Sequence, residues 1–131
     1  MIGSKAFRVV AAVFAITACS ELGSFRLSAS NLDIGPNPAV PGDQVVASFI
    51  LLLAPVQRHT VVLTIDDREH FRETSTDTPP LPYVITLGDA ADLIATYGVG
   101  THTARVEVRA EEEGETTRTQ TASFELRDAA P

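Results

Sequence analysis

The chain has 131 residues, of which 17 are acidic and 10 basic, so its formal net charge is −7 at pH 7. This acidic balance argues against binding to nucleic acid or to an anionic bilayer surface, since both would repel it. A single cysteine excludes an internal disulfide.

The first 19 residues have the three-part layout of a secretory signal. A cationic start with Lys5 and Arg8 precedes the apolar segment 9–16, which is too short to span a bilayer. The run Ile16-Thr17-Ala18-Cys19 resembles the lipobox of bacterial lipoprotein signal peptides, in which the cysteine thiol receives a diacylglyceryl group, cleavage follows and the new terminus is acylated. The alternative is a buried or membrane helix, with Cys19 as a small core residue.

This resemblance implies a signal peptide over residues 1–18, lipid attachment at Cys19 and a lipid bilayer as partner through the acyl chains. Residues 19–24 would be the lipidated cysteine and a polar tether, whose five residues after Cys19 reach at most about 18 Å. Ser20 stands where an aspartate would suggest inner-membrane retention in many Gram-negative lipoproteins. The resemblance therefore favours the outer membrane, facing the periplasm or the cell surface.

Removal of residues 1–18 leaves 113 residues, which is enough for one domain. Eight arginines then stand against 17 acids, a net charge of −9, and the only lysine is lost. With Cys19 lipidated, the chain offers no lysine for a Schiff base or a P-loop and no thiolate nucleophile.

The first predicted strand changes its face part of the way along. Residues 25–30 alternate apolar and polar, but Leu32 and Ile34 continue the alternation with the opposite parity. The chain must therefore slip by one residue near Ser30-Asn31 through a bulge or kink. The proline-rich stretch 35–43 that follows predicts a rigid connection that cannot join a central ladder.

The almost continuous apolar run 44–53 predicts a buried strand. We place Val45, Ala47, Phe49 and Leu51 inward, which leaves Ile50 and Leu52 pointing outward. We expect the helix described below, or the linker after Pro36, to cover this pair; otherwise Ile50 and Leu52 mark a contact surface for another protein.

Further strands are predicted over 60–65, 70–74, 83–87, 101–110 and 117–127, with turns or loops between them. One short helix interrupts this series before the penultimate strand. Asp89 can cap it, and Ala90, Leu93, Ile94 and Tyr97 form a single apolar stripe. Gly98 is placed to end the helix in the left-handed conformation.

About seven short strands with one short helix predict an all-β fold, an antiparallel sandwich over residues 25–127 with a tail at 128–131. Three stretches, 37–45, 61–68 and 98–108, together resemble bacterial immunoglobulin-like domains, particularly the cell-adhesion-related type called CARDB and its fibronectin-like relatives. The resemblance implies an immunoglobulin-like sandwich, adhesion or scaffolding, and no catalytic residues.

The histidines at 59, 70 and 102 fall in a predicted loop, on a short strand and at the start of a strand. Zinc needs convergent ligands, usually four, so we expect no metal here. Instead we expect His102 to pack at a corner of the sandwich with a hydrogen bond.

Acidic residues gather in two predicted turns. Asp66, Asp67 and Glu69 could bind Ca²⁺, but their spacing matches no calcium loop, and a solvated hairpin turn is the better interpretation. Residues 111–115 hold four glutamates and predict a solvated loop tip that blocks edge-to-edge pairing.

These features predict a non-catalytic lipoprotein without a cofactor, whose sandwich binds an unidentified protein or surface glycan in the bacterial envelope. Two alternatives stay open. One is calcium-dependent adhesion. The other is a small hydrolase or enzyme accessory that uses Asp66, Asp67 or Glu69 with a histidine.

Overall fold

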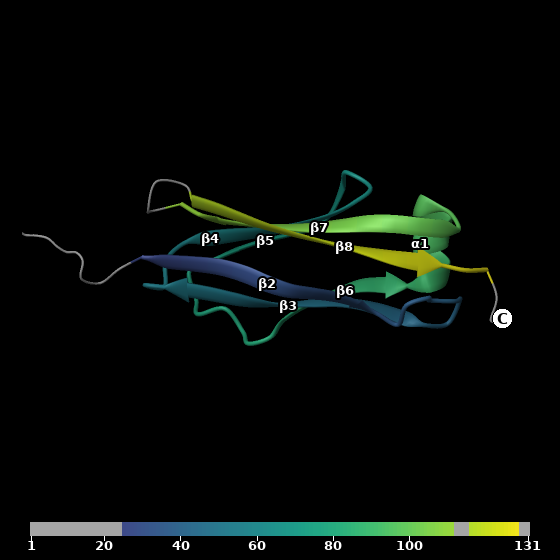
Figure 1. The fold of residues 1–131 in the computed structure, drawn as a ribbon, viewed down its shortest axis with the longest axis horizontal. Coiled ribbons are helices and arrows are strands. Elements are labelled where there is room, and N and C mark those ends of the chain that lie inside the picture. Colours follow the sequence, from purple (N-terminus) through teal and green to yellow (C-terminus); the bar gives the residue numbers. More distant parts are fainter. Residues whose placement is uncertain (1–24, 112–115, 129–131) are drawn as a thin grey trace, which may run out of the picture.

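The described residues form seven strands in two antiparallel sheets that lie face to face (Figure 1). In the computed structural model, which describes residues 25–111 and 116–128, the strand order is β2-β3-β6 in one sheet and β5-β4-β7-β8 in the other. The elements in chain order are β2 Arg26–Gly35, β3 Gln44–Ala54, β4 His59–Ile65, β5 Arg68–Ser75, β6 Tyr83–Asp89, α1 Ala90–Tyr97, β7 Gly100–Ala110 and β8 Thr116–Leu126.

The predicted all-β, immunoglobulin-like antiparallel sandwich of about seven strands is confirmed, and its helix precedes the penultimate strand. The chain changes sheets between β3 and β4, again between β5 and β6, and a third time through α1. Each sheet is therefore assembled from strands far apart in the sequence.

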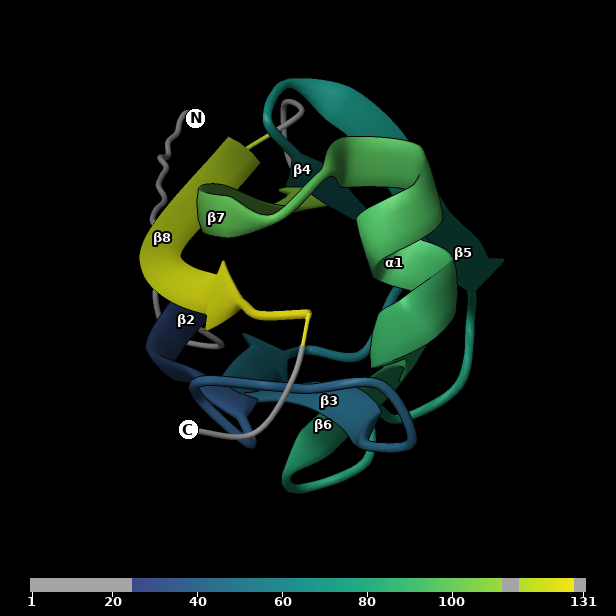
Figure 2. The ribbon, with the colours of Figure 1, turned by 90° about the vertical axis from the view of Figure 1, so that its right-hand side faces the viewer.

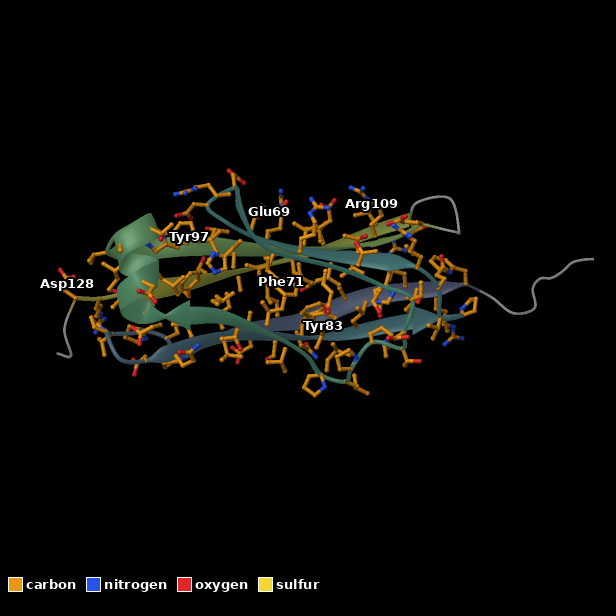
Figure 3. The ribbon with its side chains drawn as sticks, turned by 180° about the vertical axis from the view of Figure 1, so that it is seen from behind. Glu69, Phe71, Tyr83, Tyr97, Arg109 and Asp128 are labelled. Atoms are coloured by element: carbon orange, nitrogen blue, oxygen red, sulfur yellow. The ribbon has the colours of Figure 1, made fainter. Side chains whose placement is uncertain are left out.

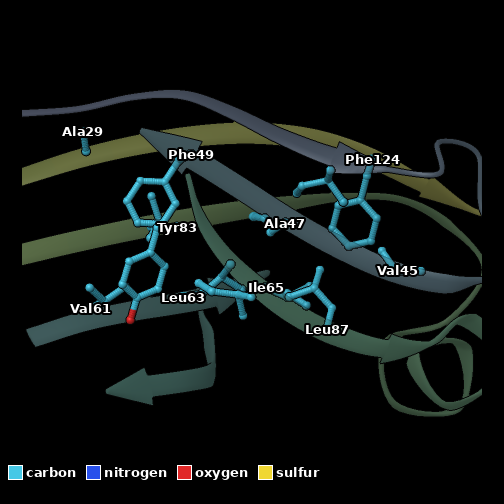
Figure 4. Packing of buried hydrophobic residues seen from close by; sticks show 14 of the residues in the cluster. Ala29, Val45, Ala47, Phe49, Val61, Leu63, Ile65, Tyr83, Leu87 and Phe124 are labelled. Atoms are coloured by element: carbon cyan, nitrogen blue, oxygen red, sulfur yellow. The ribbon is translucent and has the colours of Figure 1, made fainter. Parts of the chain in front are cut away.

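The core lies between the two sheets and includes the residues of the run 44–53 that were predicted to point inward (Figure 4). On β3 these are Val45, Ala47, Phe49 and Leu51. The rings of Phe49 and Tyr83 lie 5.1 Å apart between their centroids. Burial of one such large apolar side chain contributes about 1.5–3 kcal/mol, so this layer is the main source of stability.

The slip predicted in the first strand is present. The pairing of β2 with β3 shifts register between Ser30 and Asp33. Asn31 lies in this shift with φ 58°, a left-handed conformation that asparagine tolerates better than most residues. The shift brings both Leu27 and Ile34 to the buried face, although their spacing has odd parity.

The predicted polar turn joins β4 to β5. Asp66 and Asp67 occupy its two central positions with φ of 50° and 68°. Positive φ at both positions gives the backbone twist that matches two right-handed strands in a tight hairpin. The turn holds the Asp66 side chain beside β7, which pairs with β4 on the other side.

Helix α1 runs between the two sheets at one end of the sandwich (Figure 2), and we call this end the helix pole. The side chain of Asp89 accepts a hydrogen bond from the Ala91 backbone at 2.8 Å, which confirms the predicted cap. Gly98 ends the helix with φ 93° and ψ 166°. The predicted left-handed conformation of Gly98 is wrong, because the chain extends at once toward β7.

The two sheets are joined along both open sides. On one side, Ala39 forms two backbone hydrogen bonds along the edge of β8, both 2.9 Å long. Its N–H donates to the Glu125 carbonyl, and its carbonyl accepts from the Arg127 N–H. On the other side, the Tyr83 hydroxyl donates to the Glu73 carboxylate, and His70 Nε2 lies 2.8 Å from the Leu87 carbonyl. We call this second set of contacts the side-chain seam.

Candidate functional site

The helix pole brings together Asp66 and His102, two of the residues singled out in the sequence. The Asp66 Oδ2 atom lies 2.5 Å from Nδ1 of His102, and Oδ1 accepts from the Thr103 backbone at 3.0 Å. The other ring nitrogen, Nε2, lies 2.7 Å from the Gly98 carbonyl oxygen. His102 is 6% exposed. The prediction that it packs at a corner with a hydrogen bond is confirmed.

A second histidine completes the pole. His70 Nε2 faces the Leu87 carbonyl, which can only accept, so this nitrogen donates. In the neutral ring Nδ1 then accepts from the Tyr97 hydroxyl at 2.8 Å. The guanidinium carbon of Arg68 lies 5.2 Å from the ring centroid of Tyr97, the last residue of α1 (Figure 3). These contacts fix the helix to both β5 and β6.

The pole network offers no free base for catalysis. Each ring nitrogen of His70 and His102 faces an oxygen partner within 2.8 Å. A general base needs a nitrogen that faces the substrate's proton. The Thr103 N–H and then His102 hold the pKa of Asp66 below its ordinary value of 3.8. Asp66 therefore positions the turn, and the arrangement does not favour the hydrolase alternative.

The other two acids of the turn do not join Asp66. Glu69 pairs with Arg72 at 2.9 Å, and this contact lowers the pKa of Glu69 and raises that of Arg72. Asp67 is exposed at the tip. Within residues 25–111 and 116–128, no group of three or more His, Cys, Asp or Glu side chains lies close enough to hold a metal ion. The geometry of this turn does not favour the calcium alternative.

His59 lies apart from the other histidines. The sequence predicted it in a loop, but it is the first residue of β4 and only 2% exposed. Its Nδ1 lies 2.8 Å from the Gln57 carbonyl. The loop assignment is wrong because pairing with Ser75 and Ala110 extends the strand backward. The three histidines do not converge.

Glu111 is bound, although the sequence predicted a solvated loop tip there. Its carboxylate lies 3.2 Å from Arg58 Nε and accepts from the Thr60 hydroxyl at 3.0 Å. The rest of the predicted tip, residues 112–115, lies outside the described residues. At Glu111 the prediction is wrong, because β4 begins beside the end of β7 and brings both Arg58 and Thr60 near its carboxylate.

A shallow groove of about 410 Å³ lies on the outer face of the four-stranded sheet. Its lining residues are Thr64, Asp66, Asp67, Thr103, Arg105 and Thr121. Arg105 and Arg109 lie on the same face of β7, since they are four residues apart, and the register places threonines of β4 and β8 across from both. Neither arginine has an ion-pair partner among the described residues. Arg109 lies on the outer side of this sheet in Figure 3.

Ile50 and Leu52 point outward from β3, as predicted. Ile50 is half-buried beside Ser30 of β2, but Leu52 is 52% exposed. The expectation that the helix or the linker covers the pair is wrong for Leu52, because α1 lies at the helix pole and contacts β6 and β8. Val84 on β6 adds a third outward apolar side chain, 53% exposed. The pair stays a predicted contact surface.

The predicted signal peptide, Cys19 and the tether fall on residues 1–24, which lie outside the described residues. No helix among the described residues has the length and apolar character needed to cross a bilayer. No protein-family model, no curated protein and no solved structure matches this chain.

Proposed function

We propose that this chain is a bacterial envelope lipoprotein, held to its membrane by acyl chains on Cys19, whose sandwich binds or supports another envelope component without catalysis. The run Ile16-Thr17-Ala18-Cys19 carries this proposal. It follows a cationic start and a short apolar segment, and a folded strand begins only seven residues after Cys19, at Arg26.

The side chains at the helix pole support a binding function. Its histidines and Asp66 are already bonded to each other or to backbone atoms. Such a network makes the pole rigid and leaves little for chemistry. In this proposal the domain belongs with bacterial immunoglobulin-like modules of the CARDB or fibronectin-like kind, and its partner is a protein or a surface glycan.

The surface best suited to a polar partner is the outer face of the four-stranded sheet. Arg105 and Arg109 lie there among threonine hydroxyls, in a chain whose overall charge is acidic. An unpaired arginine beside hydroxyl groups can donate several hydrogen bonds to a carboxylate or a sugar.

Replacement of the acylated cysteine tests the anchor. We expect Cys19→Ser to move the protein from the membrane fraction to the soluble fraction, because the thiol that carries the lipid is gone. Ser20→Ala is the matched control and should stay in the membrane fraction. Mass spectrometry of the wild type should show a mature amino terminus at residue 19 with added acyl mass. Unchanged partitioning of Cys19→Ser would refute lipidation.

A pull-down of the lipidated protein from its own membrane tests the binding function. We expect a retained partner that Arg105→Glu with Arg109→Glu releases, while Arg118→Glu, exposed near the start of β8 in the same sheet, retains it. A retained partner that the double variant still binds would show that another surface makes the contact.

A further inference from the structure

The two outer faces of the sandwich differ sharply in charge. Strands β2 and β3 and residues 83–87 of β6 contain only two charged side chains, Arg26 and Asp33, whose charges cancel. The outer face of the four-stranded sheet carries five charged side chains from two strands, Glu69 and Arg72 on β5 and Arg105, Glu107 and Arg109 on β7. One side of the domain is thus nearly uncharged, although the chain as a whole is strongly acidic.

The uncharged side also exposes large apolar side chains. Leu52 and Val84 project from β3 and β6, each with about half of its surface in solvent. The loop between β5 and β6 extends beyond this sheet (Figure 1) and carries Leu81, which is 66% exposed. We call these three residues the apolar face. Exposed apolar side chains gathered on one outer side of a domain are typical of contact with a membrane or another protein.

The position of the chain entry decides between these occupants. Arg26 at the start of β2 pairs with Ala54 at the end of β3, so the chain enters the fold two residues along β3 from Leu52. We call this the anchor end. The tether of residues 20–24 reaches at most about 18 Å, so a bilayer that holds Cys19 lies within reach of the apolar face. A tethered contact needs little intrinsic affinity, because the linker keeps the local concentration high.

Charge also decides how the domain lies on that bilayer. Strand β7 ends and β8 begins at the anchor end, since Ala110 and Thr116 pair there, and residues 111–115 between them include four glutamates. An end-on orientation would press these glutamates against anionic headgroups, which repel them. With the three-stranded sheet toward the membrane, the ends of β7 and β8 that flank this segment belong to the sheet on the far side.

We propose that the outer face of the three-stranded sheet rests on the bilayer that anchors Cys19, with Leu52, Val84 and Leu81 in the lipid interface. This inference rests on the proposed lipidation and adds which side of the domain meets the membrane. It also reduces the conflict between an acidic chain and an anionic surface, because Arg26 and Asp33 cancel on the strands in contact and the loop that carries Leu81 adds only Asp77. The groove around Arg105 then points away from the membrane.

Site-specific labels test this orientation in the full lipidated protein. Acylation blocks the Cys19 thiol, so one introduced cysteine is the only free thiol. Val84→Cys labels the apolar face, and Thr119→Cys, exposed on the outward side of β8 opposite Glu107, is the matched control. Each variant is labelled with an environment-sensitive fluorophore and reconstituted in vesicles of phosphatidylethanolamine with a minor share of phosphatidylglycerol.

We expect nitroxide-bearing lipids to quench the label at residue 84 several-fold more than the label at residue 119, and aqueous iodide to do the reverse. Equal quenching of both labels by each agent would overturn the orientation. A second result would also overturn the proposed orientation. If iodide quenches the label at residue 84 in vesicles, but neither iodide nor nitroxide lipids quench it in native membranes, a protein covers this face.

A charge variant separates this contact from the anchor. Leu52→Glu with Leu81→Glu should abolish the lipid quenching at residue 84, while the protein still sediments with the vesicles through its acyl chains. Both positions are exposed, so neither change creates a cavity in the core. Persistent lipid quenching would contradict the proposal. If lipidation itself fails, the protein does not sediment and Cys19 reacts with the label, a result distinct from either outcome.

Discussion

Both carboxylate oxygens of Asp66 bond to β7, one to His102 and one to the Thr103 backbone. Asp66→Asn keeps the shape but removes the charge that both donors face. We expect a loss of about 1 kcal/mol in the free energy of unfolding, at the low end for charged hydrogen bonds because the side chain is 41% exposed. Urea denaturation at pH 7 measures it. Asp67→Asn, its exposed neighbour, should change stability by less than about 0.5 kcal/mol.

The Asp66 carboxylate also makes the free energy of unfolding depend on pH in the acidic range. Its pKa in the folded protein lies below the ordinary 3.8, so its contribution is complete above about pH 5 and declines as the pH falls through the folded-state pKa. Wild type should therefore lose more stability than Asp66→Asn on going from about pH 5 to pH 3. Parallel acid profiles for the two proteins would contradict this role.

Both tyrosines of the chain resist ionisation. Burial and then the hydrogen bond to Glu73 raise the pKa of Tyr83 far above its ordinary 10.0, and burial raises that of Tyr97. The unfolded phenols ionise first, so stability should fall as the pH rises above about 10. Ultraviolet titration of the native protein should show less phenolate near pH 10 than the same titration of the unfolded chain. A native titration of half the tyrosine signal at the ordinary pKa would disprove the assignment for one of them.

At the scale of the elements, Asp89 holds two segments at once. Its carboxylate caps α1 through the Ala91 N–H and also lies 3.3 Å from the Gly42 N–H, in the turn before β3. Asp89→Ala should cost about 1–2 kcal/mol, the upper range for a lost cap, because it frees both donors. Asp92→Ala, in the exposed first turn of the helix, should cost only a few tenths. Thermal or urea unfolding followed by circular dichroism compares the two, and equal losses would argue against capping.

The element bounds could be predicted from the sequence because a strand buried on one face alternates apolar and polar residues with a period of two. The predicted strands agree with β2 to β8 within two residues, and the slip near Asn31 followed from parity alone. Features that depend on a distant strand could not be predicted in this way. His59 joins β4 because Ala110 pairs with it, and Glu111 is bound because Arg58 and Thr60 lie across from it.

The candidate surfaces also combine features that a local sequence pattern predicts with features that depend on a distant strand. The run 44–53 placed Leu52 outward, and the spacing of four residues puts Arg105 and Arg109 on one face of their strand. The groove also needs Thr64 from β4 and Thr121 from β8, which the register brings beside Arg105. That register is set by long-range pairing, so no local pattern contains it.

At the scale of the whole molecule, the two sheets share one core and the chain passes between them three times. The side-chain seam adds contacts where β5 and β6 face each other, through Tyr83 and His70. Neither sheet can bury its apolar face without the other, because an isolated three-stranded sheet leaves that face in water. The described domain should therefore unfold as one unit.

Core truncations in opposite sheets test this unity. Leu63 on β4 and Ile85 on β6 are each at most 1% exposed, so Leu63→Ala and Ile85→Ala should each cost about 2–5 kcal/mol. Each variant should shift one urea transition, with the same midpoint by circular dichroism and by tyrosine fluorescence, since Tyr83 and Tyr97 report different ends of the fold. Thr86→Ala, exposed on β6, should leave the midpoint almost unchanged. Separate midpoints for the two probes in Ile85→Ala would mean that the four-stranded sheet survives alone, and the shared core would then not explain the fold.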